Sequence, residues 1–466
     1  MIYIDKTIST PLNRQIYNCI VDSILSNHYK PFEKLPATRK LAMELSVSRN
    51  TVILAYQQLL SEGYITSLVG SGYMISDIAT MNAWMEEKKM HFSPTIQKKP
   101  KAMPYNFTYG NIDNHNFPYS LWKKSLLHAL EYMENQPFSK YPNYKGEPML
   151  QTNIASYLHQ ARGITCDPSQ IIITSGHQFS MKMIATLFQV TGKRLAFENP
   201  GYDGTRKVFE HFNYTILPIP VEKNGVDTQY LNSIQADLLY LTPSHQFPTG
   251  SVLPIKKRLQ VIQWAHENNS YIIEDDYDSE LRYYTPPIPS MCSLDSLNKT
   301  IYAGTFSKTL LASIRVAYLV LPHSLLPLFH QYYANYNSSV SVLIQLALAD
   351  FISCGNYERH LNRLRTTYKK KQKELLHALY QIFGKHITII GDLAGIHFLI
   401  LLDTHLSSDE LIRRAAELGI EMKGASNYYL APLSCPKNML LLGYSCIPSE
   451  KYLELFTQLA KAWNIR

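Results

Sequence analysis

Apolar residues in the first 80 positions recur with the period of short amphipathic helices. A first helix is predicted from a stripe at every fourth position, formed by Leu12, Ile16, Ile20 and Ile24. A second helix is predicted after Thr38. After a short turn, Ser48 is placed to cap a third helix, which runs from about residue 49 to 61 with its apolar residues on one side.

The segment after the third helix alternates between apolar and polar residues and predicts a hairpin. It reads GYITSLVGSGYMIS, with Gly70 and Gly72 at its tip. Three small helices and a hairpin predict a winged helix-turn-helix, whose third helix is narrow enough for a DNA major groove. Its first turn carries Arg49, Asn50 and Thr51, which can bond phosphates and base edges. On the pattern alone, a small helical cap with a polar surface is an equal alternative.

Beyond about residue 105 the pattern becomes a long alternation of helical stretches and short β-rich runs, which predicts an α/β domain. Between the two patterns, residues 78–104 are rich in lysine and punctuated by proline, without a sustained period, and they predict a linker. The chain is therefore expected to consist of a small folded part over 1–77, the linker, and a large part over 105–466.

The composition excludes several classes of protein. With 466 residues, 45% hydrophobic and 18% charged, the chain is neither disordered, collagen-like nor a coiled coil, and it is too long for one compact core. The apolar runs are too short to span a bilayer and the N-terminus lacks a signal-peptide pattern, so we expect a soluble, cytoplasmic protein.

The six cysteines include no C-x-x-C pair, so we expect no metal and no disulfide framework. The net charge of +8 permits nucleic acid as a partner without requiring it.

Four segments of the large part carry candidate chemistry, and the first two are turns. In IIITSGHQFSMKMIATLF an apolar strand leads through a small-residue turn into a helix, whose free N–H groups can bind a phosphate; the turn residues are Ser175, Gly176, His177 and Gln178. In ENPGYDGTR, Tyr202 can stack on a flat cofactor ring. The alternatives are a turn that binds nothing and an aromatic residue that anchors a loop.

The other two segments lie at strand ends. YIIEDDYDSE places Asp275 and Tyr277 at the carboxyl edge of a buried strand, where acidic groups contact metals, ribose or pyridinium rings, although a solvated strand end is more common. In IYAGTFSKTLLASIR, Lys308 is flanked by hydroxyl groups. This set suits a phosphorylated aldehyde, with a Schiff base at Lys308 and the phosphate held by Thr305, Ser307 and Arg315. The alternative is an exposed lysine in a hydroxyl-rich loop.

Residues 8–76 resemble the GntR-type winged-helix signature. KLPATRKLAMELSVSRNTVILAYQQLLSEGYITSLVGSGYMI follows its motifs L-P-S-x-R-x-L-A, V-S-R-x-T-V, L-x-x-E-G and G-x-G in order. The resemblance implies DNA contacts in the helix-turn-helix and a glycine-shaped wing, and the expected DNA-binding residues are Arg39, Ser48, Arg49, Asn50, Thr51, Gly70 and Gly72. Residues 1–77 hold 7 basic and 6 acidic side chains, so affinity is expected from a local cluster and from dimerisation.

Together the four segments resemble fold-type I aminotransferases that use pyridoxal 5′-phosphate (PLP), and with the GntR-like head the whole chain is similar to MocR/GabR-family regulators. TPSHQFPTG, IIEDDYDSE and GTFSKTLLASIR are especially close to that family. The resemblance implies a mainly parallel sheet, PLP in an aldimine with Lys308, Asp275 at the pyridine nitrogen, Tyr277 at the ring hydroxyl and Tyr202 on the ring. The remaining expected cofactor contacts are Ser175, Gly176, His177, Gln178, His245, Thr305, Ser307 and Arg315.

The chain departs from the aminotransferase pattern in three places. Phe247 stands where aminotransferases have Asn before Pro-Thr-Gly, so His245 or Gln246 is expected to supply the polar contact. Where the arginine that binds the substrate carboxylate should precede the strand MLLLGYS, only Lys437 is nearby, and it is the candidate contact for an effector carboxylate. GABA-responsive members have an arginine where this chain has Gly204, so an amine or amino acid other than GABA is expected.

These observations favour a homodimeric transcriptional regulator that binds an operator in double-stranded DNA and senses an amino compound through Lys308. Two alternatives stay open: a sensor of PLP itself that governs vitamin B6 synthesis, and a working aminotransferase with an appended DNA-binding head. In the first interpretation transaminase activity is weak at most, because a lysine is a flexible point charge where an arginine would clamp a carboxylate with two parallel bonds.

Overall fold

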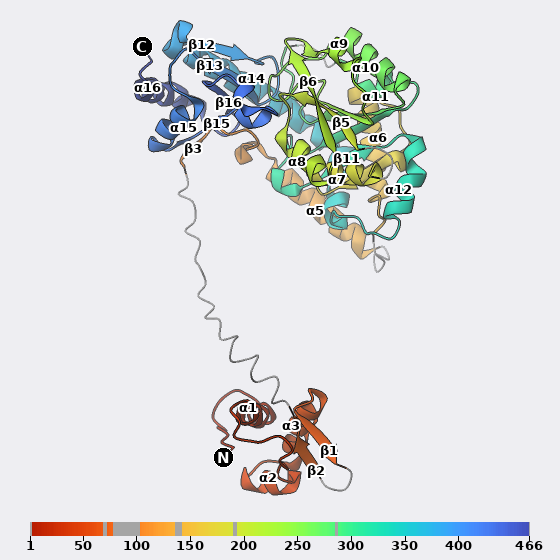
Figure 1. The fold of residues 1–466 in the computed structure, drawn as a ribbon, viewed down its shortest axis with the longest axis vertical. Helices are drawn as coiled ribbons and strands as arrows, with labels where there is room; N and C mark the ends of the chain where they lie inside the picture. Colours follow the sequence, from red (N-terminus) through yellow and green to blue (C-terminus); the bar gives the residue numbers. More distant parts are fainter. Residues whose placement is uncertain are drawn as a thin grey trace. The chain divides into compact units, whose positions relative to one another are not determined.

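The structure is a computed structural model that describes residues 2–68, 72–77, 103–135, 142–189, 193–284 and 288–465. The chain divides into two compact units, Met1–Pro100 and Lys101–Arg466 (Figure 1). Among the described residues, no helix is both long and apolar enough to cross a bilayer.

The described residues of the first unit form three helices and a hairpin. They are α1 (Leu12–Leu25), α2 (Thr38–Glu44), α3 (Arg49–Ser61), β1 (Ile65–Leu68) and β2 (Gly72–Ile75). The strands pair antiparallel, and the helices share one core in which the most buried side chains are Ile16, Ile20, Val52, Ala55, Tyr56 and Leu59. The predicted winged helix-turn-helix is therefore confirmed, and the tip of the hairpin, with Gly70, lies outside the described residues.

An eight-stranded sheet forms the centre of the second unit. Its spatial order is β4 (Ile171–Thr174), β11 (Ala317–Val320), β10 (Thr300–Thr305), β9 (Tyr271–Asp276), β8 (Leu238–Leu241), β5 (Arg194–Asn199), β6 (Thr215–Glu222) and β7 (Gly225–Val226). The five strands from β10 to β6 run parallel, and β11 and β7 are antiparallel to their neighbours. Strands buried on both faces read as continuous apolar runs, which explains sequences such as LLYL in β8.

Helices cover both faces of this sheet (Figure 1). One face packs on α7 (His177–Leu187), α8 (Asp203–His211) and α12 (Leu326–Tyr333). The other face packs on α5 (Tyr119–Glu134), α6 (Pro148–Arg162), α10 (Ile255–Glu267), α11 (Met291–Leu294) and α13 (Val342–Ser353), and α9 (Thr228–Leu231) lies beside β6. These layers confirm the predicted α/β class with a mainly parallel sheet.

A smaller antiparallel sheet follows along the chain. Its order is β12 (Ile387–Ile390), β13 (His397–Leu402), β16 (Met439–Gly443) and β15 (Lys423–Gly424). One face packs on α14 (Asn356–Phe383), α15 (Ser408–Glu417) and α16 (Tyr452–Trp463), and β3 (Tyr105–Asn106) pairs with β14 (Ile420–Glu421). Short 3-10 turns occur at Asn114–Asn116, Pro168–Gln170, Ala312–Ile314, His323–Leu325, Gly384–His386, Ser426–Tyr428, Pro432–Ser434 and Ser449–Lys451.

Candidate functional site

A cavity of about 170 Å³ lies at the carboxyl edge of the eight-stranded sheet. Asp275, Thr242 and Thr305 reach it from the ends of β9, β8 and β10, where open α/β sheets commonly bind ligands. Its full lining is Tyr109, His177, Gln178, Tyr202, Thr242, Phe247, Asp275, Tyr277, Thr305, Ser307, Lys308 and Arg315.

Lys308 lies just after β10 and is half-buried. Its Nζ is 4.0 Å from the centroid of the Tyr109 ring. Burial lowers the pKa of Lys308 to about 8, although the carboxylates of Asp278 and Asp275 oppose the shift. A larger share of this amine is therefore neutral near physiological pH than of an exposed lysine, and the neutral amine is the form that attacks carbonyl carbons.

Asp275 is buried and uses only one of its two carboxylate oxygens within the described structure. Oδ2 accepts a hydrogen bond from the Tyr240 hydroxyl and lies 3.5 Å from Nε2 of His177. Oδ1 is buried without a hydrogen-bond partner among the described residues. Burial raises the pKa of Asp275, while His177 and Tyr240 oppose the shift. A carboxylate oxygen held in this way on a cavity wall suits a charged N–H donor of a ligand.

The part of the cavity around the start of α7 is suited to an anion. α7 begins at His177, so its first N–H groups point out of the helix end. Gly176 precedes it with a φ of 108°, and a Cβ there would lie 2.6 Å from Nη2 of Arg315, so the guanidinium packs directly on this backbone. The Thr305 hydroxyl accepts a hydrogen bond of 3.1 Å from the Ser307 N–H. Helix N–H groups, hydroxyls and a guanidinium together suit a phosphate.

Tyr202 is held in place by its neighbours. Its ring packs edge-to-face against Phe247, with centroids 5.4 Å apart, and against His177 at 6.0 Å. A Cβ on Gly204 would lie 2.6 Å from Cε1 of Tyr202. The ring therefore occupies the space that any side chain at position 204 would need, which gives a physical reason for glycine there.

The face of the small sheet that packs beside the cavity is almost entirely apolar. Side chains alternate along β16, so Met439 and Leu441 point toward Phe247 and Tyr277, whereas Leu440 and Leu442 point toward the helices on the other face. The Phe247 ring also contacts Tyr428 edge-to-face at 4.9 Å. Met439 and Leu441 do not line the cavity themselves, and they place hydrocarbon rather than a guanidinium behind Phe247 and Tyr277.

The structure brings most of the predicted cofactor residues together and leaves others apart. Nine of the twelve lining residues were predicted as cofactor contacts, and Phe247 was predicted as a departure from the aminotransferase pattern. Ser175 instead bonds Ser339 Oγ through its N–H at 3.1 Å. His245 lies behind Tyr277, whose hydroxyl donates to the His245 carbonyl oxygen at 2.8 Å. Lys437 is exposed before β16 and does not line the cavity.

Gln246 does not reach the cavity either. Its amide nitrogen donates to the Pro200 carbonyl oxygen at 2.8 Å and its oxygen accepts from the Thr249 hydroxyl at 2.6 Å. These bonds stabilise the turn that positions Phe247.

The sequence did not identify three residues of the site: Tyr109, Tyr240 and Thr242. The position of Thr242 directly after β8 resembles that of Asp275 at the end of β9 and could have identified it, whereas no local signal marks Tyr109.

In the first unit, four predicted DNA-binding residues, Ser48, Arg49, Asn50 and Thr51, lie at the start of α3, whereas Arg39 lies on α2 and Gly72 begins β2. Ser48 caps α3, because its Oγ accepts from the Thr51 N–H at 3.1 Å. Arg39, Arg49 and Asn50 are exposed and Thr51 is half-buried. The exposed guanidinium and amide groups around one helix N-terminus form a surface that can contact a nucleic-acid backbone and base edges.

Comparison with known proteins gives two family matches. Residues 12–75 match the family of bacterial regulatory proteins of the gntR type, and residues 106–439 match aminotransferase class I and II.

The chain is similar over most of its length to the following three proteins. The probable rhizopine catabolism regulatory protein MocR of Rhizobium meliloti is 32% identical over 99% of this chain and 96% of its own length. The HTH-type pyridoxine biosynthesis transcriptional regulator PdxR of Corynebacterium glutamicum is 29% identical over 91% of this chain and 89% of its own. The α-aminoadipate aminotransferase LysN of Thermus thermophilus, solved with N-(5′-phosphopyridoxyl)-L-leucine, is 25% identical with a TM-score of 0.70, over 78% of this chain and 92% of that chain.

Proposed function

Since the chain belongs to the family of HTH-type transcriptional regulators that includes MocR, with a GntR-type winged helix and an aminotransferase class I and II domain, we propose that it holds PLP at Lys308 and senses a small amino compound there. We assign residues 1–77 to DNA binding, 78–104 to a linker and 105–466 to the effector domain. The observation that carries the proposal is the presence of Lys308 and the unpartnered Oδ1 of Asp275 in one cavity.

The residues of the cavity fit the parts of PLP. Asp275 would accept a hydrogen bond from the pyridine nitrogen, and Tyr202 would lie on the ring. The phosphate would be held by the α7 N-terminus and by Thr305, Ser307 and Arg315. When bound, PLP supplies an aldehyde carbon that condenses with primary amines and a ring that withdraws electrons.

Lys308 is the group through which sensing would operate. Its lowered pKa favours the neutral amine that bonds the cofactor, and a competing primary amine would release it. The released Nζ, close to the Tyr109 ring and attracted by the carboxylates of Asp275 and Asp278, would then regain a proton and alter the packing around it. An effector of this kind acts on DNA binding only if it favours one of two conformations of the protein.

The apolar face of β16 supports a sensor rather than an efficient aminotransferase. Fast transamination needs a substrate held rigidly, and a misplacement of about 1 Å can cost roughly a hundredfold in rate. Leu441 and Met439 cannot hold a carboxylate by two parallel bonds. We therefore infer that any transaminase activity is weak and that the effector's far end is apolar or uncharged.

A sensor of PLP itself is the second candidate, and the similarity to PdxR favours keeping it. In that case DNA affinity would follow occupancy of Lys308 by PLP, and no amine would change it further. The two candidates share the cofactor site and differ only in the signal.

We also propose that the protein acts as a homodimer on an operator in double-stranded DNA. On α5, Tyr119, Leu127 and Leu130 are each half or more exposed and fall on one side of the helix, an unusual surface for large apolar side chains. L127E with L130E should shift the full chain from dimer to monomer in light scattering. A wild-type chain that is monomeric at micromolar concentration would contradict this proposal.

The DNA-binding proposal is tested with Arg49→Ala, with Arg39→Ala and with the double variant. A bidentate contact to guanine would cost about 1–3 kcal/mol at one operator position, and a phosphate contact would weaken binding to all sequences and lower the salt slope by about one. Arg194→Ala, on the exposed start of β5, is the control. Unchanged operator affinity of the double variant would place the DNA-contacting surface elsewhere.

The cofactor is tested by adding PLP to the cofactor-free full chain. We expect a visible absorbance band that borohydride abolishes, and a phosphopyridoxyl mass on the peptide that contains Lys308. A reduced label on any other lysine, or no band, would contradict the assignment.

A further inference from the structure

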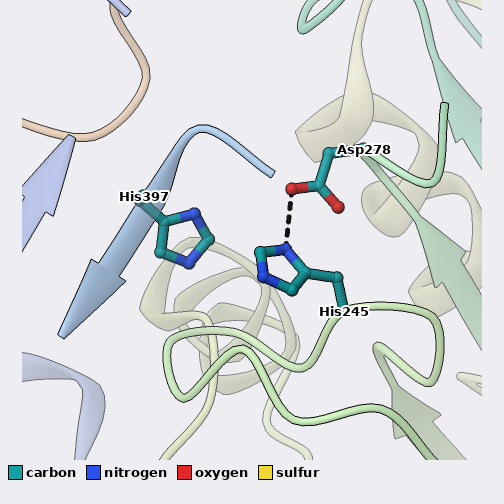
Figure 2. A group of neighbouring side chains, drawn as sticks. All are labelled: His245, Asp278 and His397. Atoms are coloured by element: carbon teal, nitrogen blue, oxygen red, sulfur yellow. Dashed lines mark hydrogen bonds and ion pairs between the residues drawn. The ribbon is translucent and has the colours of Figure 1, made fainter. Parts of the chain in front are cut away.

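A second buried cluster of polar side chains lies behind the cavity wall. His245 follows β8, Asp278 follows β9, and His397 is the first residue of β13. Their exposed fractions are 2%, 2% and 0%. Figure 2 shows the two imidazole rings and the carboxylate gathered around one small volume.

Hydrogen bonds fix one side of this cluster. Asp278 Oδ2 lies 2.8 Å from Nδ1 of His245, so the carboxylate orients the ring and directs Nε2 away from itself (Figure 2). The Tyr277 hydroxyl donates to the His245 carbonyl oxygen at 2.8 Å and lies 3.1 Å from Nδ1. His245 is therefore held from two neighbouring residues of one loop.

Three imidazole nitrogens of the cluster have no hydrogen-bond partner among the described residues. They are Nε2 of His245 and both ring nitrogens of His397. Buried polar atoms are almost always paired, because leaving them unpaired in the interior is costly. The His397 ring is enclosed by the rings of Tyr109, Phe247 and Tyr277, at centroid distances of 4.7, 5.1 and 6.4 Å, which offer it no strong acceptor in these contacts.

The backbone closes the cluster on another side. Gly395 has a φ of 71°, and a Cβ there would overlap Cε1 of His245 and lie 2.5 Å from Asp278 Oδ2. One potential ligand atom from each of the three residues lies within 4.8 Å of the others. The cluster is thus compact, enclosed and composed of donors that bind cations.

We propose that His245, Asp278 and His397 bind one divalent transition-metal ion, with zinc as the expected occupant. Imidazole nitrogen and carboxylate oxygen are ordinary zinc ligands, and Nδ1 of His245 and Oδ2 of Asp278, 2.8 Å apart, would both bind the ion in place of their mutual hydrogen bond. The absence of thiol ligands among these three residues favours a borderline ion of this class over a soft one such as Cu(I). The ion would also offset the buried charge of Asp278.

The position of the cluster gives the ion a structural role. His245 and Asp278 come from loops of the eight-stranded sheet, and His397 comes from the four-stranded sheet. A bound ion would tie the two sheets together next to Tyr277. The sequence-based expectation of no metal rested on cysteine spacing, and it could not detect three ligands contributed by separate strands and loops.

The test uses the full chain, stripped with a chelator and dialysed, in cofactor-free and PLP-loaded forms. After zinc is added back, we expect one equivalent per chain by elemental analysis in both forms, so the result does not depend on the proposed function. X-ray absorption should show nitrogen and oxygen ligands at about 2.0–2.1 Å and no sulfur. Cobalt(II) as a probe should give visible bands of a four-coordinate site, and zinc should raise the unfolding temperature of the stripped chain.

Two variants locate the ion. His397→Phe keeps an aromatic ring and should lose zinc and its thermal effect, whereas His128→Phe, on the exposed side of α5, should retain both. If His397→Phe does not fold, His245→Gln serves in its place. Absence of stoichiometric metal in the wild-type chain, sulfur ligands in the absorption spectrum, or full zinc retention by a folded cluster variant would each overturn the proposal.

Discussion

The two ends of the cavity differ in chemistry. One end has Lys308, the free oxygen of Asp275 and the Arg315 guanidinium beside α7, a set of charged groups that suits a phosphorylated pyridine ring. The other end has the Phe247 ring, which packs in an apolar cluster with Tyr428, Met439 and Leu441 behind the lining. Among the described residues, the lining thus offers charged groups for a cofactor and an apolar ring where a substrate carboxylate would need a cation, and this contrast supports the proposed sensor.

Removing the Lys308 amine at the charged end should have the largest effect on PLP attachment. Lys308→Ala should abolish the borohydride-sensitive band and the covalent label completely, because no other amine lines the cavity among the described residues. Lys207→Ala, whose exposed side chain pairs with Asp203 at 3.0 Å, is the matched control and should label normally. Retention of a reducible band by Lys308→Ala would show that the charged end has another function.

Neutralising Asp275, the proposed contact of the pyridine nitrogen, should have the next largest effect, a loss of PLP affinity. Asp275→Asn replaces a charge-assisted hydrogen bond, worth about 1.5–3 kcal/mol, with a neutral one. We expect PLP affinity, measured by absorbance titration, to fall by roughly ten- to a hundredfold. The variant should keep its unfolding temperature within a few degrees, because the oxygen of the new amide can still accept from the Tyr240 hydroxyl. Wild-type affinity for PLP in this variant would exclude Asp275 as the ring partner.

The pH dependence of cofactor attachment tests the burial of Lys308. Its folded pKa of about 8 lies below the ordinary value of 10.5, so the neutral amine predominates above pH 8 and becomes rarer as the pH falls. The rate of PLP attachment should fall about tenfold per pH unit below 8 and level off above it. Stopped-flow absorbance measures this profile, and a rate that keeps rising to about pH 10 would show an ordinary exposed lysine.

The apolar end predicts a smaller effect on ligand choice. An arylalkylamine such as phenethylamine should perturb the PLP spectrum at a concentration roughly three- to tenfold lower than phenylalanine, since a carboxylate beside the Phe247 ring loses hydration without gaining a partner. Tighter binding of the amino acid than of the amine would reveal a carboxylate contact and remove the contrast between the two ends.

The sequence predicted the small unit more completely than the large one. The apolar stripe of α1, the Ser48 cap and the 49–61 helix are local features, and each follows from residues within a few turns. In the cavity, Lys308, Asp275 and Arg315 could be predicted because each lies in a recognisable strand-end motif. Tyr109 could not, since its contact with Lys308 depends on how β3 and the small sheet pack, and the cluster around His397 depends on the same packing.

The most direct test of the sensor proposal follows the PLP spectrum and operator affinity of one sample during titration with primary amines. We predict that at least one amine changes both signals at the same half-saturating concentration, that Lys308→Ala loses both responses, and that keto or aldehyde product accumulates slowly or not at all. Operator affinity that follows PLP occupancy alone, with no response to any amine, or rapid steady turnover without any change in operator affinity, would contradict the proposal.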